Sequence, residues 1–290
     1  MNTRQQSPVV HHLSRPAGRL AYTDEGSGPL VVAAPAMGDL RSTYDDVAPR
    51  LVEAGYRVVV MDLRGHGDSS TTFAVHGDEA TASDLVALVE HLDAGPAVLL
   101  GNSFAASAAV VAAAERPELV RGLVLLNGFL REPLSPARQR LLRVAYRVLF
   151  ARPWGGAVWA SYYGVLAKGR KPARLAAHRA ALRASLAEPG RLRSFRDLCL
   201  QLDHSVVEPR LARVQAPALA LYGALDPDYA DPAAEASFAE ERLGATTAVL
   251  PEVGHYPQVQ APEEVLAAVL PFLAGLPALA TAPVDGDARG

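Results

Sequence analysis

The stretch from residue 97 to residue 114 most constrains the fold of this 290-residue chain. It opens with Ala97–Leu100, an apolar run long enough for a buried strand, and ends in an alanine-rich segment with high helix propensity. Between them, Gly101, Ser103 and Ala105 form a small-x-Ser-x-small pattern, with alanine where the second small residue is usually glycine. Small residues are needed there because the strand and helix backbones approach closely. The pattern predicts a strand–turn–helix elbow that lifts the serine above a parallel sheet.

Two other interpretations of this stretch are open. Residues 94–114 carry no charge, which on length alone admits a transmembrane helix. Asn102, Ser103 and the break at Gly101 argue against a membrane span. A structural turn with an idle serine is the second alternative, and a nucleophilic serine is the interpretation that the pattern favours.

Apolar runs and helical segments alternate through most of the chain. The runs fit for strands are residues 30–34, 57–62, 97–100, 120–127, 218–222 and 246–250, with short edge strands near residues 9–10 and 20–22. The helical segments are the alanine-rich one and residues 43–54, 79–92, 232–242 and 263–273. Such alternation predicts an α/β fold built on a doubly wound, mostly parallel sheet.

The alternation stops in the middle of the chain, where the pattern is wholly helical over residues 130–213. We therefore predict an inserted helical cap over this segment. The sheet core is expected from residues 1–129 and 214–275, and a flexible C-terminal tail from residues 276–290.

Composition limits the chemistry and the location. Half of the residues are hydrophobic, enough for a sizeable core, and a net charge of −3 predicts no general attraction to nucleic acid. The single cysteine, Cys199, excludes an internal disulfide and a cysteine-based metal cage, and no phosphate-binding glycine loop is recognisable. The N-terminal residues lack the apolar core of a signal peptide, and prolines interrupt the uncharged run 265–284. We therefore expect a cytoplasmic protein without a membrane span.

Three side chains that follow predicted strands have the chemistry of a nucleophile, an acid and a base. A serine hydroxyl is a weak nucleophile at neutral pH and needs an adjacent base that an acid orients. In a doubly wound sheet, functional groups gather beyond the carboxyl ends of the strands. Ser103 follows one such strand, and Asp226 and His255 follow the last two. Asp228 is an alternative acid, although a solvated loop position suits it better.

Four motifs in chain order resemble those of α/β-hydrolase fold enzymes, and the resemblance covers nearly the whole chain. They are the elbow at Ser103, the Gly-Tyr-Arg-Val-Val-Val-Met-Asp-Leu-Arg-Gly-His-Gly-Asp-Ser stretch at residues 55–69, Gly-x-x-Asp at residues 223–226, and Gly-His at residues 254–255. The resemblance implies that Ser103 is the nucleophile, that His255 is the general base and acid, and that Asp226 orients the imidazole. It implies no cofactor and no metal.

The same resemblance implies two backbone N–H groups that hold an oxyanion, those of Met37 and Phe104. The family commonly has His-Gly before the first donor, whereas Pro35 and Ala36 stand here. Because a backbone donor does not depend on the type of side chain, Met37 keeps this assignment.

The identity of the nucleophile narrows the reaction. Dehalogenases and epoxide hydrolases of this fold use a carboxylate at this position, so Ser103 argues against both. The prediction is a carboxylesterase-like serine hydrolase that cleaves a carboxylic ester or related acyl bond of a small molecule. A carbon–carbon bond hydrolase or an acyltransferase on the same triad stays open, as does a non-catalytic ligand-binding protein of this fold.

The predicted cap is strongly basic. Residues 131–213 hold fifteen arginines and two lysines against five acidic residues, a net charge of +12, which leaves −15 for the rest of the chain. The favoured interpretation is that the arginines are solvated and that a neighbouring acidic surface stabilises their charges. Alternatives are attraction of an anionic substrate or an acidic carrier protein, and docking on an anionic membrane. Trp154, Trp159 and Tyr162 are predicted to form an apolar pocket above Ser103.

Three further histidines are predicted to lie outside the triad. His66, in the glycine-rich loop, is predicted to be structural. His178 and His204 lie in the cap, where a surface position is favoured and a position in the wall of a pocket is the alternative.

Overall fold

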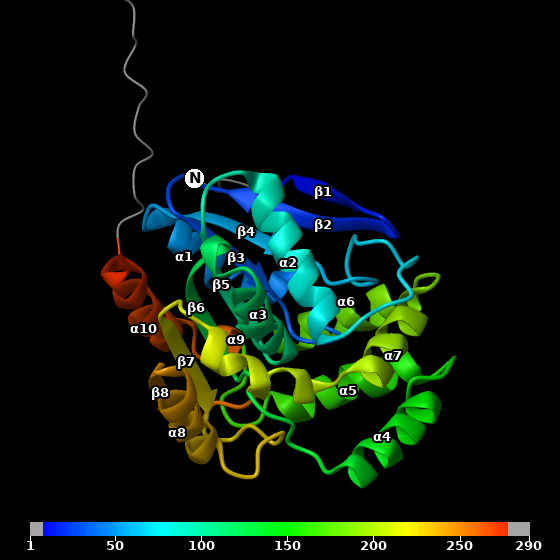
Figure 1. Cartoon of the computed structure of the whole chain (residues 1–290). Helices are drawn as coiled ribbons and strands as arrows, with labels where there is room; N and C mark the ends of the chain where they lie inside the picture. Colours follow the sequence, from blue (N-terminus) through cyan, green and yellow to red (C-terminus); the bar gives the residue numbers. More distant parts are fainter. Residues whose placement is uncertain (1–7, 278–290) are drawn as a thin grey trace, which may run out of the picture.

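The computed structural model describes residues 8–277, and an eight-stranded sheet runs through it in the order β1-β2-β4-β3-β5-β6-β7-β8 (Figure 1). The strands are β1 (Val10–Arg15), β2 (Gly18–Glu25), β3 (Leu30–Ala34), β4 (Arg57–Met61), β5 (Ala97–Asn102), β6 (Val120–Leu126), β7 (Ala218–Gly223) and β8 (Thr246–Leu250). β1 pairs antiparallel with β2, and β2 pairs antiparallel with β4. All further neighbours in this order, from β4 to β8, pair parallel. The predicted α/β fold with a mostly parallel sheet is confirmed.

Helices cover both faces of the sheet (Figure 1). They are α1 (Ala48–Glu53), α2 (Asp78–Leu92), α3 (Phe104–Glu115), α4 (Pro136–Leu149), α5 (Gly155–Leu166), α6 (Leu175–Ala187), α7 (Arg191–Gln201), α8 (Pro232–Leu243), α9 (Pro257–Gln260) and α10 (Pro262–Gly275). Short 3₁₀ turns are η1 (Arg41–Tyr44), η2 (Pro117–Leu119), η3 (His204–Val206) and η4 (Glu208–Arg213). One apolar cluster joins the sheet to α2, α3 and α8, and a second joins it to α1 and α10. The sheet is therefore doubly wound, and its central strands read as continuous apolar runs because both faces are buried.

The prediction of one continuous helix over residues 43–54 is wrong. The chain forms the turn η1 first and starts α1 only at Ala48. Pro49 lies in the first turn of α1, where its missing N–H does no harm, whereas inside a longer helix it would remove a hydrogen bond.

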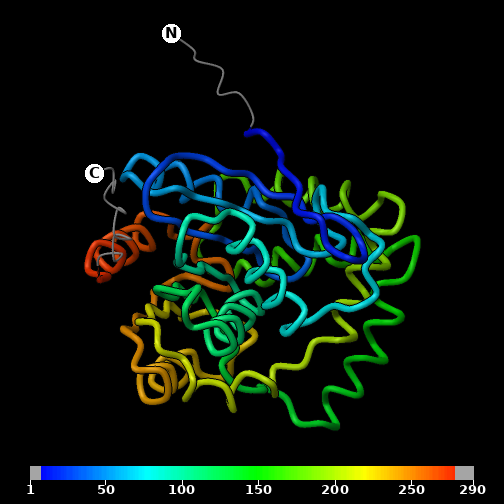
Figure 2. The backbone as a smooth tube through the Cα atoms, turned by 45° about the horizontal axis from the view of Figure 1, so that its top comes forward, coloured from blue at the N-terminus to red at the C-terminus, as the bar shows by residue number. Residues whose placement is uncertain are grey.

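Four helices, α4 to α7, lie between β6 and β7, where the sequence turns wholly helical (Figure 2). A third apolar cluster, which includes Trp159, Tyr163, Phe195 and Tyr256, joins α5, α6 and α7 to the end of the sheet. The exact limits of the cap stay a prediction. Most of the predicted tail, residues 278–290, lies outside the described residues, and Leu276 is buried in the cluster beneath α10.

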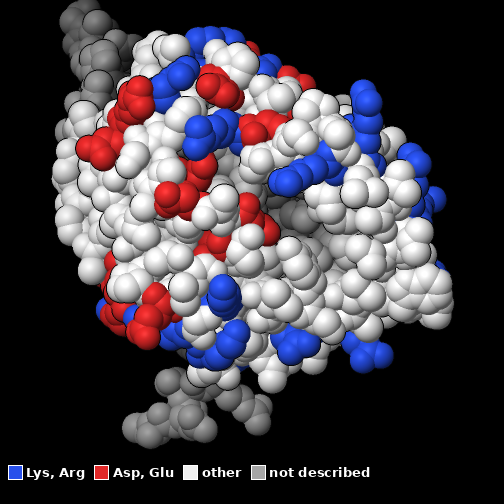
Figure 3. All heavy atoms as spheres, turned by 90° about the horizontal axis from the view of Figure 1, so that it is seen from below, with Lys and Arg blue, Asp and Glu red and all other residues white. Residues whose placement is uncertain are grey.

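Arginines of the helical insertion meet carboxylates of the sheet core. The pairs, with nitrogen–oxygen distances of 2.5–3.3 Å, are Arg131–Glu235, Arg170–Glu264, Arg174–Asp45, Arg174–Asp46, Arg210–Glu79, Arg210–Glu115 and Arg213–Glu115. Seen from below, acidic side chains gather over one half of this face, and basic and uncharged ones cover the other half (Figure 3). The opposite charges of insertion and core thus meet in part across their own boundary. Within residues 8–277, no helix combines the length and the apolar character that a bilayer crossing requires.

Candidate active site

Ser103 occupies the sharp turn between β5 and α3. Its backbone has φ 59° and ψ −130°, a conformation that costs a non-glycine residue free energy and persists only where the surroundings fix it. The Ser103 N–H donates to the Leu126 carbonyl at 2.8 Å, which ties the turn to β6. A Cβ at Gly101 would lie 2.4 Å from the Ala106 nitrogen, so only glycine fits the start of the elbow. The local geometry is the one that the small-x-Ser-x-small pattern predicts.

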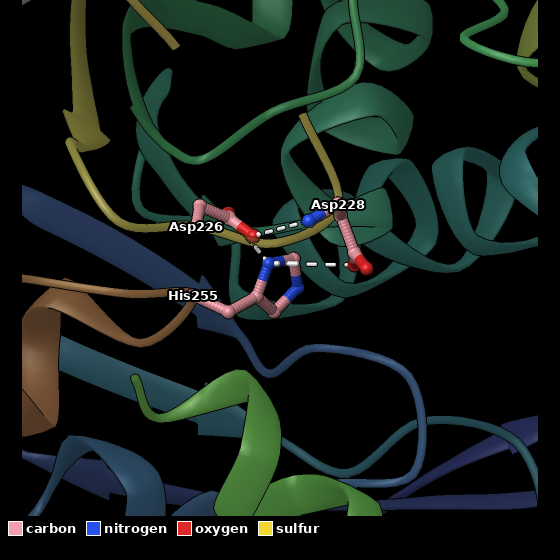
Figure 4. A group of neighbouring side chains, drawn as sticks. All are labelled: Asp226, Asp228 and His255. Atoms are coloured by element: carbon pink, nitrogen blue, oxygen red, sulfur yellow. Dashed lines mark hydrogen bonds and ion pairs between the residues drawn. The ribbon is translucent and has the colours of Figure 1, made fainter. Parts of the chain in front are cut away.

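Asp226 and His255 meet beyond the ends of β7 and β8 (Figure 4). The Asp226 Oδ2 lies 2.7 Å from the His255 Nδ1, and both side chains are almost fully buried. The Asp228 N–H donates to the other Asp226 oxygen at 3.0 Å, which fixes the carboxylate plane. The bond from the His255 Nδ1 to the Asp226 carboxylate makes Nδ1 the protonated nitrogen of a neutral imidazole and leaves Nε2 as the acceptor.

Asp228 is a second carboxylate beside the same imidazole. Its Oδ2 lies 3.6 Å from the His255 Nδ1, and the side chain is only 28% exposed. The solvated loop position predicted for Asp228 is wrong. Asp228 lies in the cavity wall, where it accepts a hydrogen bond from the Tyr162 hydroxyl at 3.4 Å. Burial raises the pKa of Asp228. Burial lowers the pKa of His255, but the charges of Asp226 and Asp228 and the bond to Asp226 outweigh it and raise this pKa to about 9.

Two buried asparagines that the sequence analysis did not single out hold the loops of the site. The Asn102 amide donates at 3.0 Å to the His255 carbonyl and to the Leu126 carbonyl. The Asn127 amide donates to the Gly254 carbonyl at 2.9 Å. Asn102 is the last residue of β5, two positions beyond the predicted strand, and Asn127 ends the strand predicted over residues 120–127.

A cavity of about 600 Å³ has Ser103 and His255 in its wall. Its wall contains Ser103, His255, Met37, Phe104, Trp159 and Tyr162, together with further apolar residues of α4, α5 and α7. Within the described part of the chain, the Ser103 hydroxyl makes no hydrogen bond to the His255 ring. Such contacts are often long before a substrate binds.

Trp154 is not in the cavity wall, contrary to the prediction. Trp154 is 49% exposed, and its indole N–H donates to the Val148 carbonyl at 2.9 Å, which places it at the end of α4.

The loop after β3 presents backbone donors to the cavity. Between residues 8 and 277, neither the Met37 nor the Phe104 N–H has an acceptor, and both residues line the cavity next to Ser103. The next N–H, that of Gly38, donates to the His66 Nε2 at 3.2 Å. Burial lowers the pKa of His66 to about 4, so this imidazole stays neutral and accepts the bond. The expectation of a structural role for His66 agrees with these contacts.

The cap fixes this loop from the other side. The Trp159 indole N–H donates to the Gly38 carbonyl at 2.8 Å. The fully buried Asp39 bonds to the His178 Nε2 at 2.6 Å and accepts from the Tyr163 hydroxyl at 3.2 Å. His178 therefore does not lie on the cap surface as predicted.

His204 is also buried and lies in the cavity wall, so the favoured surface position is wrong and the alternative of a pocket position holds. Its Nδ1 bonds to the buried Asp78 at 2.9 Å, and its ring stacks on Phe129 with centroids 4.7 Å apart. Burial is the largest single influence on the pKa of His204 and lowers it. The charge of Asp78 and this hydrogen bond together outweigh burial and raise the pKa.

Asp226, Asp228 and His255 bring potential metal-ligating atoms within 4.8 Å of one another. The hydrogen bonds of these atoms indicate a different role. The Asp226 oxygens are taken by the His255 ring and the Asp228 N–H, so a cation would have to replace the Nδ1 proton. The group fits a hydrogen-bonded acid and base better than a metal site.

An elbow serine, an Asp–His pair at the neighbouring strand ends and a helical insertion over a mostly parallel sheet together define an α/β-hydrolase fold. The Alpha/beta hydrolase family model matches residues 31–268. The chain belongs to this family.

Individual relatives match more narrowly. The 2-(acetamidomethylene)succinate hydrolase of Mesorhizobium japonicum is 31% identical over 121 residues, 40% of this chain and 43% of that protein. An epoxide hydrolase of Caballeronia sordidicola is 33% identical over 110 residues, 37% of this chain and 33% of that protein. The chain thus spans less than half the length of these curated relatives. A solved esterase from Thermogutta terrifontis superposes with a TM-score of 0.75 at 23% identity, over 93% of this chain and 98% of that one, which shows the shared fold.

Proposed function

We propose that the protein is a serine hydrolase that cleaves a carboxylic ester or related acyl bond of a small molecule. The observation that carries this proposal is the meeting of an elbow serine and a carboxylate-bound imidazole in one cavity wall. Ser103 supplies the oxygen nucleophile, and His255 Nε2, with Asp226 holding the opposite nitrogen, supplies the base.

The proposed reaction has two halves. In the first, Ser103 Oγ attacks the acyl carbon while His255 takes its proton, and the tetrahedral oxyanion accepts bonds from the N–H groups of Met37 and Phe104. His255 then gives that proton to the departing alcohol. In the second half, His255 activates a water that attacks the acyl-enzyme, and Ser103 leaves with the proton returned. Asp226 stabilises the imidazolium in both halves.

One of the relatives is an epoxide hydrolase, which raises the question whether this chain opens epoxides or cleaves acyl bonds. Enzymes of this fold that open epoxides use a carboxylate nucleophile. Ser103 stands at that position here, which supports acyl chemistry instead. A carbon–carbon bond hydrolase or an acyltransferase would use the same triad, and a screen that includes an alcohol acceptor and a ring-cleavage product separates them.

The cavity wall supports an uncharged acyl group. The wall contains one arginine, Arg143, and the imidazoles of His204 and His255, together with the carboxylates of Glu132 and Asp228. The remaining wall is largely apolar. The anionic substrate considered from the overall charge of the cap gains little from such a balanced lining. Matched neutral and anionic esters test this point, and we expect the neutral ester to have the higher kcat/KM.

Active-site labelling tests the proposal as a whole. A fluorophosphonate probe should label the wild-type chain with one equivalent, and Ser103→Ala should lose the label together with hydrolysis of p-nitrophenyl esters. Ser237→Ala, which removes an exposed hydroxyl of α8, is the matched control and should keep both. A folded wild-type chain that takes no label and hydrolyses no ester would instead support a ligand-binding protein of this fold.

A further inference from the structure

Helix α4 has two apolar faces, and only one of them is used by the cavity. Leu142, Tyr146 and Leu149 lie in the cavity wall. Leu141, Val144 and Val148, spaced three and four residues apart, form a stripe on the opposite face. Their exposed fractions are 70%, 57% and 62%, and no residue of α4 is buried. We call these three residues the outer stripe.

Trp154 extends the outer stripe beyond the end of the helix. Its indole N–H donates to the Val148 carbonyl, which holds the half-exposed ring next to the last stripe residue. Helix α4 lies at the periphery of the molecule, as both ribbon and tube show (Figures 1 and 2). Aliphatic side chains and an indole are thus presented together to the outside.

Arginines flank the outer stripe on both sides. Arg140 and Arg147 lie along one side of it and Arg138 along the other, and α4 contains no acidic residue. In the region from residue 8 to residue 277, none of these three takes part in an ion pair. This distinguishes them from Arg174 and Arg210, whose guanidinium groups meet carboxylates of the core. The half of the lower face without acidic side chains in Figure 3 agrees with this distribution.

We propose that the outer stripe of α4 docks the protein on an anionic phospholipid surface, with the helix lying in the plane of that surface. The aliphatic side chains enter the acyl boundary, the arginines reach the lipid phosphates, and the indole of Trp154 lies at headgroup depth. This combination of an apolar stripe and flanking cations without acidic partners fits a lipid surface better than a second copy of the chain, because two such stripes would bring like charges together. The docking does not depend on the proposed hydrolase activity.

Vesicle sedimentation with the full chain tests the docking. Wild-type protein should sediment with vesicles of phosphatidylcholine and phosphatidylglycerol, and at least tenfold less with phosphatidylcholine alone. The triple variant Leu141→Ser, Val144→Ser, Val148→Ser should lose at least tenfold in partitioning onto the mixed vesicles. Val75→Ser is a matched control, because Val75 is also 62% exposed and lies outside α4, and it should partition like the wild type.

The charges are tested separately. Arg140→Gln combined with Arg147→Gln should weaken partitioning roughly tenfold, and 0.5 M salt should remove most of the remaining difference. A control that removes two exposed arginines of the core, Arg19→Gln with Arg242→Gln, should change partitioning less than twofold. Circular dichroism checks that each variant is folded.

Three outcomes overturn the proposal. One is that the folded wild type stays in the supernatant with mixed vesicles. Another is that the stripe variant and the Val75→Ser control partition equally. The third is a concentration-dependent dimer of the wild type that the stripe variant abolishes while vesicle binding is unchanged, which would assign the outer stripe to a second copy of the chain.

Discussion

Replacing Asp228 by asparagine should shift the pH dependence of the proposed hydrolase to lower pH. The base form of His255 is the neutral imidazole, so kcat/KM rises as pH rises through the pKa of this residue. With that pKa at about 9, about 1% of the imidazole is neutral at pH 7. Asp228 contributes to this high value because its carboxylate favours the charged ring.

The size of the shift follows from the distance. A unit charge 3.6 Å from the His255 Nδ1 contributes about 1.2 kcal/mol at the dielectric constant of water and more in a partly buried site. This corresponds to about one pKa unit as a lower limit. In Asp228→Asn the midpoint should therefore fall to about 8, and the neutral fraction at pH 7 should rise about tenfold. The plateau at high pH should be lower, because the imidazolium formed in the transition state loses one stabilising charge.

The assay is kcat/KM for a p-nitrophenyl ester from pH 6 to pH 10, with non-enzymatic hydrolysis subtracted. Asp228→Glu, which keeps the charge, is the companion variant and should keep a midpoint near that of the wild type. Equal midpoints for the wild type and Asp228→Asn would refute the electrostatic reasoning. A midpoint near 6.5 in the wild type would do the same, since it would mean that the two carboxylates only offset the effect of burial and do not raise the pKa above its ordinary value.

Three further substitutions test the parts that position the site. Gly38→Ala places a Cβ 2.5 Å from the Trp159 indole at a backbone φ of +69° and should move the adjacent Met37 N–H, the proposed oxyanion donor. The kcat should therefore fall about a hundredfold, with a smaller change in KM. Gly101→Ala meets the backbone nitrogen of α3 at 2.4 Å and should lower the free energy of unfolding by about 1–3 kcal/mol in urea titrations. His178→Gln should lower the free energy of unfolding, and urea titrations should show a larger loss at pH 6 than at pH 9. The charge of Asp39 and its hydrogen bond outweigh burial and raise the folded pKa of His178, so this contribution is complete below the unfolded pKa of 6.5 and should vanish as pH rises through the folded value.

The sequence predicts those parts of the site that depend on residues close together in the chain and on the order of the strands. The elbow at Ser103 depends on residues within two positions of it, and the order of the strands brings Asp226 and His255 to the same edge of the sheet. The alternation of apolar runs and helices was enough to predict the sheet. The catalytic roles of these residues stay a prediction until the labelling experiment is done.

What the sequence did not predict depends on contacts between distant segments. Asp39 and His178 are 139 positions apart, and nothing near either residue in the sequence indicates that they meet. Asn127 is an ordinary strand-end residue until the loop before His255 lies against it. Trp154 was placed in the pocket because it is aromatic and lies in the cap, but the turn after α4 directs its ring outward. Residue type predicts what a side chain can do, and the packing of the cap decides where it does so.

The helices of the cap differ in whether their hydrogen bonds reach the loop after β3. Helices α5 and α6 carry Trp159, Tyr163 and His178, whose hydrogen bonds reach the loop that presents the Met37 N–H. A displacement of these helices would therefore move the proposed oxyanion donor. Helix α4 forms part of the same cavity wall without a single buried residue. Among residues 8–277, the side-chain hydrogen bond that leaves α4 runs from Arg143 to the Leu202 carbonyl and does not reach the loop that presents the Met37 N–H. We therefore expect substitutions on the outer face of α4 to leave the proposed oxyanion donor in place.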